Sequence, residues 1–177
     1  MFKKAAFFAT LLFGFSFSPR LHAQALPAAR TGSHLTVGGM FSVFSPDYGS
    51  NQLMGLGVYT DFNVSHHWGA EGEVRFLRLN QLYDVHEDNY LIGPRYRFHI
   101  WRVDPYVKIM FGNGQFNFPF SLAHGGYAMW APGGGVDLRL NRRFTARADY
   151  EYQHWNGFQD SSLTPHGVSF GLAYQIF

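Results

Sequence analysis

The sequence predicts an all-β protein, an eight-stranded antiparallel up-and-down β-barrel that spans a membrane. Three observations support this fold class. Apolar residues alternate with small or polar ones at a period of two in eight segments of the chain. Aromatic residues make up 19% of the chain and glycines number 20, whereas only 15% of residues are charged, which is typical of strands with one apolar face. No apolar run is long enough for a membrane helix of about 20 residues.

The first 25 residues are predicted to be a secretory signal peptide. Lys3 and Lys4 provide a positive start, residues 5–17 an apolar stretch, and Ala23-Gln24-Ala25 a small-residue cleavage site. Cleavage after Ala23 would fit nearly as well, and an uncleaved anchor is the alternative, although the apolar stretch is short for a bilayer. We therefore divide the chain into a signal peptide (1–25), a short periplasmic N-terminal segment (26–33) and an outer-membrane β-barrel domain (34–177).

Composition bounds what the exported chain can be. Removing 25 of 177 residues leaves 152, which fits a single domain. The chain contains no cysteine, so it has neither disulfides nor thiolate chemistry. A formal net charge of +2 argues against a nucleic-acid partner.

Eight segments have at least the 9 to 11 residues that a tilted membrane strand needs. They are residues 34–45, 52–64, 67–79, 89–101, 104–115, 126–140, 143–155 and 166–177. Tight turns at Ser65-His66, Arg102-Val103 and Asn141-Arg142 alternate with longer loops at 46–51, 80–88, 116–125 and 156–165. Short turns and both termini are expected in the periplasm, and the longer loops outside.

The two faces of these strands follow from residue parity, taken here in chain order. The third strand has Ala70, Val74 and Phe76 on its outward face. In the fourth strand the outward residues are Tyr90, Ile92, Pro94, Tyr96, Phe98 and Ile100, opposite the inward Arg95, Arg97 and His99. The seventh strand presents Phe144, Ala146, Ala148, Tyr150 and Tyr152 outward. In the last strand the outward residues are Val168, Phe170, Leu172, Tyr174 and Ile176. Charged faces must point into the barrel, away from lipid.

Inward charges are balanced across the eight strands. Six acids meet six bases in the predicted lumen: Asp61, Glu71, Glu73, Asp137, Asp149 and Glu151, with Arg75, Arg95, Arg97, Lys108, Arg139 and Arg147. An eight-stranded barrel is only wide enough for side chains to fill its interior. Unpaired buried charges cost several kcal/mol, so equal numbers favour a plugged, ion-paired lumen over an open channel.

Aromatic residues near the strand ends are expected to form two girdles at the membrane interfaces. The periplasmic girdle would contain Trp68, Trp101, Tyr106 and Phe144, and the outer girdle Phe44, Tyr90, Trp130 and Trp155. A soluble sandwich or lipocalin-like barrel, which would bury the aromatic faces inside, is the alternative.

Three segments resemble small outer-membrane β-barrel proteins of the OmpA/OmpX type. They are Gly133-Gly134-Gly135-Val136-Asp137-Leu138-Arg139-Leu140, Arg147-Ala148-Asp149-Tyr150-Glu151-Tyr152 and the ending Gly171-Leu172-Ala173-Tyr174-Gln175-Ile176-Phe177. The resemblance implies the outer membrane of a Gram-negative-type bacterium, and Phe177 as an assembly signal. Gln175 and Ala173 depart from the alternating apolar pattern that usually precedes the terminal Phe, so a bulge or a variant signal is expected. No peptidoglycan-binding domain follows the barrel, so no cell-wall anchor is expected.

Few residues suggest chemistry. His166 and Ser169 lie at opposite parity, and His154 is an isolated candidate base. His66-His67 is expected to be a plain turn whose two side chains point apart, and the glycines at 133–135 precede a strand rather than a phosphate-binding helix. Glu71 and Glu73 are expected to form ion pairs rather than an acid–base pair.

The expected role is therefore non-enzymatic, either structural in the envelope or in surface adhesion and interaction. A narrow pore for small solutes and a lipid-modifying enzyme are the alternatives. Neither a metal nor a cofactor is expected, and a monomer is. The resemblance implies the barrel-assembly machinery and periplasmic chaperones as transient partners, and outer-membrane lipids and lipopolysaccharide as surroundings.

Two surface features were left with open alternatives. Arg78 falls on the lipid side and is a candidate lipopolysaccharide contact, or else lies in solvent past the end of its strand. The outer loops carry aromatic residues that form either a recognition surface or a continuation of the girdle: Tyr48, Tyr83, Phe116, Phe118, Phe120 and Phe158.

Overall fold

A computed structural model describes residues 33–47, 52–79, 86–117, 124–158 and 161–177. The predicted signal peptide and nearly all of the segment 26–33 lie outside these residues. Within the described ranges, every element of regular structure is a strand. No helix in this part of the chain is long and apolar enough to cross a membrane.

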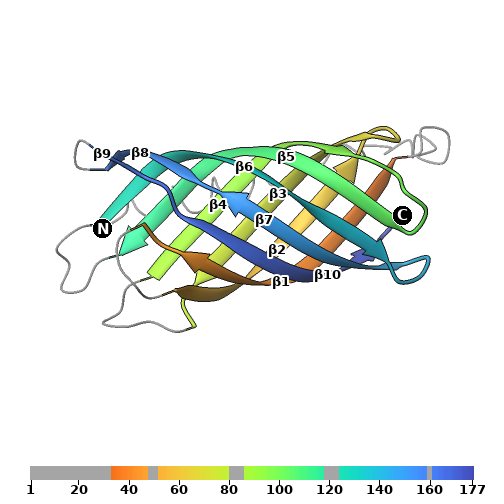
Figure 1. The fold of residues 1–177 in the computed structure, drawn as a ribbon, viewed down its shortest axis with the longest axis horizontal. Helices are drawn as coiled ribbons and strands as arrows, with labels where there is room; N and C mark the ends of the chain where they lie inside the picture. Colours follow the sequence, from red (N-terminus) through yellow and green to blue (C-terminus); the bar gives the residue numbers. More distant parts are fainter. Residues whose placement is uncertain (1–32, 48–51, 80–85, 118–123, 159–160) are drawn as a thin grey trace, which may run out of the picture.

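Ten strands follow one another in the sequence (Figure 1). They are β1 (His34–Ser45), β2 (Leu53–Asn63), β3 (Trp68–Leu77), β4 (His86–Arg97), β5 (Val103–Asn117), β6 (His124–Arg139), β7 (Phe144–Tyr152), β8 (His154–Phe158), β9 (Ser161–Leu163) and β10 (His166–Gln175). Strand β8 continues β7 past Gln153 in the same register against β6, since Gly133 pairs with Glu151 and Trp130 with His154. The two segments therefore make one strand of the wall.

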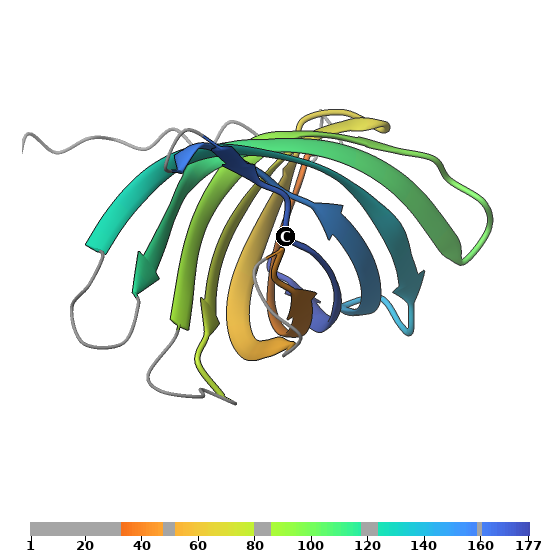
Figure 2. The same cartoon turned by 60° about the vertical axis from the view of Figure 1, so that its left-hand side comes forward.

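The sheet closes on itself. Neighbouring strands pair antiparallel in the order β5-β4-β3-β2-β1-β10-β7-β6, and β5 also pairs with β6. Ten residue pairs, from Thr36 with Gln175 to Ser45 with His166, join the first strand to the last. This confirms the predicted eight-stranded antiparallel barrel, whose curved wall is seen obliquely in Figure 2. The pairing of β10 with β1 and β7 is continuous, so the bulge considered for this strand is absent from it.

The two ends of the barrel differ. One end, at the right of Figure 1, carries the tight turns at 64–67, 98–102 and 140–143 together with His34 and Phe177; we call it the short-turn end. The opposite end carries the longer connections, and we call it the long-loop end. Most of these connections, with Tyr48, Tyr83, Phe118 and Phe120, lie outside the described residues, as do the side chains of Phe116 and Phe158.

Some predicted boundaries were wrong. The fourth strand starts at His86 and ends at Arg97, three to four residues before the predicted limits. The next turn is centred on Trp101 and Arg102 instead of Arg102-Val103, because the backbones of Ile100 and Val103 exchange two hydrogen bonds of 3.0 Å. Part of the predicted loop 156–165 is also ordered, since β8 and β9 form a small hairpin.

Parity gives the wall an apolar outer face and a mixed lumen, as predicted, but three girdle assignments were wrong. Trp68, Trp101, Phe144, Tyr90 and Trp130 are exposed on the outer surface. Three others lie inside the barrel with at most 2% of their surface exposed: Phe44, Tyr106 and Trp155. Each is two residues from a lumen side chain on the same strand, and residues two apart share a face. Aromatic type had been given more weight than parity.

Candidate functional site

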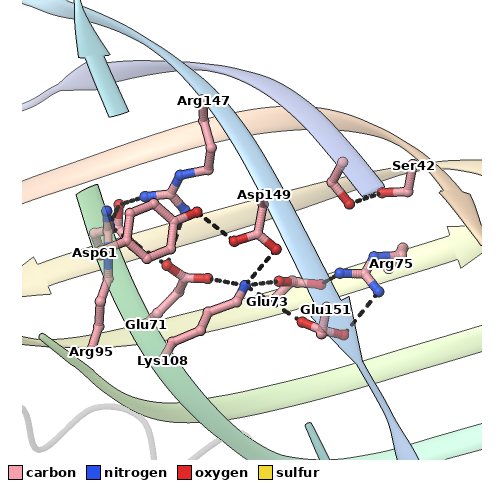
Figure 3. A network of polar contacts seen from close by, with 12 residues as sticks. Ser42, Asp61, Glu71, Glu73, Arg75, Arg95, Lys108, Arg147, Asp149 and Glu151 are labelled. Carbon is pink, nitrogen blue, oxygen red and sulfur yellow. Dashed lines mark hydrogen bonds and ion pairs between the residues drawn. The ribbon is translucent and has the colours of Figure 1, made fainter. Parts of the chain in front are cut away.

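The middle of the barrel is filled by a cluster of ten buried charged side chains, which we call the lumen network (Figure 3). It contains Asp61, Glu71, Glu73, Arg75, Arg95, Lys108, Asp137, Arg147, Asp149 and Glu151. They come from β2, β3, β4, β5, β6 and β7, so the network ties together strands on opposite sides of the wall.

Arg147 forms the centre of the part nearer the short-turn end. Its guanidinium contacts Asp61 Oδ2 at 2.6 Å, Asp137 Oδ1 at 2.8 Å and Glu71 Oε2 at 3.0 Å. Arg95 pairs with Asp61 at 2.7 Å and also with Asp137. Two guanidinium groups thus share carboxylates from three other strands, which spreads the cost of burying each charge.

Lys108 is the centre of the next layer. Its ammonium lies 2.7 Å from Glu71 and 3.3 Å from Glu73 on β3, and 3.2 Å from Asp149 and 3.5 Å from Glu151 on β7. A single buried cation therefore crosses the lumen from β5 and contacts carboxylates of two other strands. The side chain is 1% exposed, so bulk water has almost no access to it.

A hydrogen-bonded chain extends the network toward the long-loop end. Arg75 pairs with Glu73 and, at 3.2 Å, with Glu151. Gln153 donates to Glu151 at 2.8 Å and accepts from the Trp155 indole N–H at 2.9 Å. The buried indole is thus anchored to the charged layer through Gln153.

Two tyrosines complete the charged layers. The Arg147 guanidinium lies 4.0 Å from the Tyr59 ring centre, and that of Arg95 lies 3.7 Å from the Tyr106 ring centre. Tyr106 also donates its hydroxyl hydrogen to Asp149. Cation–π contacts stabilise guanidinium groups that have lost their water. A Cβ at Gly38 would come within 2.5 Å of the Tyr59 ring, so glycine at this position makes room for the tyrosine.

Two of the twelve predicted lumen charges lie outside the fully buried set. Arg97 is only partly buried, and the Arg139 side chain is 46% exposed at the short-turn end, where it contacts Asp104 at 3.1 Å. The ten buried members comprise six acids and four bases. The expected equality of buried charges was therefore wrong, because Arg139 lies where the lumen opens.

Apolar side chains close the lumen above the network, at the long-loop end. One cluster comprises Leu91, Met110, Met129, Ala131, Trp155 and Leu163, with Tyr127 packed against it. A second comprises Phe44, Leu53 and Leu77. We call these two clusters the apolar cap. Leu163 belongs to β9, so the small hairpin contributes to the closure.

Two cavities accompany these layers. A polar one of about 50 Å³ opens toward the short-turn end and is lined by Tyr59, Asp61, Asp104, Asp137 and Arg97, among others. It has room for a few water molecules. An apolar groove of about 470 Å³ lies on the wall over β2 to β5, where Gly72 leaves space between larger neighbours such as Val58 and Ile92. The groove faces the lipid side.

Three histidines lie together at the short-turn end. The His66 ring lies 4.9 Å from that of His67 and 4.1 Å from that of His99, centre to centre, so the expectation that His66 and His67 point apart was wrong. The nitrogens of His99 contact Asp104 at 2.9 Å and the His66 carbonyl oxygen at 2.8 Å. The charge of His99 lowers the pKa of the exposed His66.

The remaining predicted positions are separated from one another. Ser169 is buried and its hydroxyl lies 2.7 Å from that of Ser42, whereas His166 is exposed on the outer face near Tyr150. The ring centres of His154 and Trp130 lie 5.5 Å apart. Among the described residues, no group of three or more potential ligands could hold a metal ion.

Arg78 lies just past the end of β3. Its Nε donates to Asp88 at 2.8 Å and its Nη2 contacts the second carboxylate oxygen. The guanidinium lies 5.6 Å from the Phe76 ring centre, and 48% of the side chain is exposed. Phe177 is half exposed, and its carbonyl oxygen accepts from Leu35 N at 3.3 Å.

Sequence reasoning missed several lumen residues. Tyr59 shares a face with Asp61, and Asp104 with Lys108, so parity alone could have assigned both. Glu87, Asp88 and Asn89 are buried at the start of β4. Glu87 and Asp88 fall in the predicted loop 80–88, and Asn89 is the first residue of the predicted fourth strand.

A closed barrel with a charged interior and an apolar exterior defines an integral membrane β-barrel. The profile of the outer membrane protein beta-barrel domain matches residues 8–175, so the chain belongs to this family. No curated protein matches the sequence.

Solved structures share the fold at low sequence identity. Neisserial surface protein A is 13% identical and has a TM-score of 0.59, over 81% of this chain and 96% of that one. The N-terminal barrel of Pseudomonas aeruginosa OprF is 14% identical, with a TM-score of 0.58 over 81% and 99%. Yersinia pestis Ail, solved with the heparin analogue sucrose octasulfate, is 19% identical, with a TM-score of 0.52 over 81% and 97%. These likenesses concern the fold alone.

Proposed function

We propose that this protein is a plugged, non-enzymatic barrel in the outer membrane of a Gram-negative-type bacterium, with a structural or surface-interaction role. The carrying observation is the position of Lys108, whose ammonium contacts carboxylates of β3 and β7 across the lumen. An interior filled in this way stiffens the wall and leaves the outer loops as the part available for partners.

The apolar cap supports the same proposal independently. Met110 and Trp155 are at most 1% exposed, and they lie above the charged layers at the long-loop end. An ion crossing the lumen would have to displace both an ion-paired layer and an apolar layer. The desolvation of charges makes such a path costly.

The enzyme alternative lacks a convergent nucleophile and base among the described residues. Ser169 faces the lumen and bonds to Ser42, while His166 faces outward. A triad-like reaction needs both groups within hydrogen-bond reach of one another. The observed separation therefore favours a non-catalytic role.

The environment and partners of the chain belong to the same proposal. Arg78 presents part of its guanidinium at the long-loop end and could contact a lipopolysaccharide phosphate while it pairs with Asp88. Phe177 is exposed and accessible to the barrel-assembly machinery, with periplasmic chaperones acting before insertion. The closed wall leaves no unpaired sheet edge between its strands, which suits a monomer.

A narrow, cation-preferring pore is the second candidate. It is favoured by the polar cavity at the short-turn end and by the excess of acids over bases within the lumen network, six against four. Such a pore would require the lumen network and the apolar cap to rearrange.

Single-channel recording of the refolded protein in planar bilayers separates the two candidates. A plugged barrel gives no discrete steps, provided that its heat-modifiable gel mobility shows it to be folded. The matched variant Met129→Ala/Trp155→Ala removes much of the apolar cap, and it should stay silent if the lumen network is sufficient as a plug. Stable, cation-selective steps from the unmodified protein would overturn the plugged barrel and support the pore.

A further inference from the structure

The tight turns at the short-turn end carry exposed cations with almost no acids. Arg102 lies in the β4–β5 turn, and Arg142 and Arg143 lie in the β6–β7 turn; all three are exposed, and we call them the basic rim. Within residues 64–67, 98–104 and 139–143, the acid present is Asp104. It is 2% exposed and already paired with His99 and Arg139. The positive charge of the rim is therefore not neutralised locally.

Backbone hydrogen bonds join both turns of the basic rim to neighbouring strands. Arg139 N donates to the carbonyl oxygen of Arg102 at 3.0 Å, which joins the first turn to β6. Gln175 N donates to the carbonyl oxygen of Arg143 at 2.8 Å, which joins the second turn to the end of β10. The three arginines consequently occupy a fixed arc above the strands from β4 to β10.

Aromatic side chains place this arc at the level of lipid headgroups. The Arg102 guanidinium lies 5.2 Å from the Trp101 ring, and Trp101 is 84% exposed. Arg143 Nη1 donates to the Tyr174 hydroxyl at 2.9 Å, and Tyr174 faces outward from β10. Trp and Tyr concentrate at the membrane–water interface. The guanidinium groups that contact Trp101 and Tyr174 therefore lie at the depth of the lipid phosphate groups.

The backbone of Trp101 is a second indication. Its φ is +58°, in the left-handed region that two-residue hairpin turns require and that Asn or Gly adopts most easily. A bulky residue is disfavoured there. The turn thus holds an indole in a strained conformation at its tip, where 84% of the side chain is exposed.

We propose that the basic rim binds the phosphate groups of anionic phospholipids in the leaflet at the short-turn end. Arg forks bind phosphate oxygens bidentately, and the adjoining indole packs among the headgroups. A membrane rather than a soluble partner is favoured because the arginines are continuous with the lipid-facing Trp101 and Tyr174. The inference is independent of whether the lumen conducts.

The test is an NMR titration in nanodiscs of phosphatidylcholine with a rising fraction of phosphatidylglycerol. Each basic residue near an anionic surface favours binding by about 1 kcal/mol, which corresponds to about a five-fold preference. The indole N–H signal of Trp101 should then reach half its shift when roughly one lipid in six is anionic. Trp130, exposed on the outer face in the middle part of β6 and away from the basic rim, provides an internal reference and should respond later.

Two variants and one ligand complete the experiment. Arg102→Gln/Arg142→Gln/Arg143→Gln should abolish the early Trp101 response, whereas Arg102→Lys/Arg142→Lys/Arg143→Lys, which keeps the positive charge, should retain it. The proposal is wrong if Trp101 and Trp130 shift at the same lipid fraction, or if the glutamine variant keeps the early response. Inorganic phosphate added to phosphatidylcholine nanodiscs should have no effect; saturable shifts of Trp101 would instead indicate a soluble phosphate site and overturn the lipid assignment.

Discussion

At the scale of single residues, Arg147 shows how the lumen tolerates charge. Its guanidinium lies between the rings of Tyr59 and Tyr106, at 4.0 and 5.0 Å, while its edge bonds to carboxylates of β2, β3 and β6. Aromatic rings thus contact the faces of the Arg147 guanidinium, and carboxylates contact its edge. A buried arginine held in this way replaces most of the water contacts it has lost.

Replacing Arg147 with leucine should destabilise the barrel by about 3 to 5 kcal/mol, because it leaves Asp61, Glu71 and Asp137 with fewer cations. Urea unfolding in phospholipid vesicles, followed by tryptophan fluorescence, measures the change. The same substitution at Arg139, which is 46% exposed, should cost less than about 1 kcal/mol. Equal losses at the two positions would show that burial of the guanidinium does not determine its contribution.

Residue parity explains which lumen positions could be predicted from the sequence. Charged residues such as Glu71 and Arg147 have only one acceptable face in a membrane wall, so their placement follows from alternation alone. Aromatic residues such as Tyr106 and Trp155 fit either face. Parity with Lys108 and Gln153 is the local pattern that places them inward, whereas the space for their rings comes from glycines on other strands and has no local pattern.

At the scale of elements, β8 and β9 determine how the long-loop end is closed. Trp155 on β8 reaches across the lumen toward Gly114 on β5, where a Cβ would lie 2.3 Å from the indole. Leu163 on β9 packs into the same cluster. The contact of Trp155 with Gly114 joins strands that are separated by β6, and alternation within a single strand cannot predict such a contact.

Substituting Gly114 with alanine should destabilise the barrel by about 1 to 3 kcal/mol, because the indole of Trp155 must leave its position. Unfolding in urea gives the change. Alanine at Gly39, where the nearest atom lies 3.9 Å away, should be close to neutral. Trp155→Phe combined with Gly114→Ala should recover part of the loss, and an undiminished loss would contradict a steric cause.

Turns limit how well the ends of the elements can be predicted. Alternation continues through Phe98 and Ile100, so the pattern extended the fourth strand to residue 101. Beyond Arg97 the chain no longer pairs with β3, although it stays in register with the start of β5: Phe98 N donates to Pro105 O, and the turn closes at Ile100 and Val103. The left-handed Trp101 at its tip has no signature in the sequence, since the usual Asn or Gly is missing.

At the scale of the whole molecule, the start of β1 and the end of β10 meet at the short-turn end. Ile176 N donates a hydrogen bond of 2.8 Å to Leu35 O, and Leu35 N donates a longer one of 3.3 Å to the carbonyl oxygen of Phe177. The terminal side chain projects from the wall and is half exposed. Phe177 therefore adds little to the finished barrel and remains accessible for recognition.

Deleting Phe177 should lower the amount of folded protein in membranes of expressing cells, while refolding into detergent stays intact. Heat-modifiable gel mobility measures both quantities. Phe177→Tyr, which keeps an aromatic ring, is the matched control and should assemble normally. Normal membrane levels of the shortened chain would remove the terminal residue from a role in assembly.

Closure of β1 against β10 has a consequence for folding. The ten residue pairs between these strands join the first strand of the barrel to the last, from Thr36 with Gln175 to Ser45 with His166. Their separation in the sequence is therefore close to the full length of the barrel. Contacts of such high contact order form late, because loop-closure entropy must be overcome first. Until they form, two rows of unpaired peptide groups would face hydrocarbon. A partly closed barrel is therefore unstable in a bilayer, and membrane insertion and barrel closure must proceed as one cooperative event.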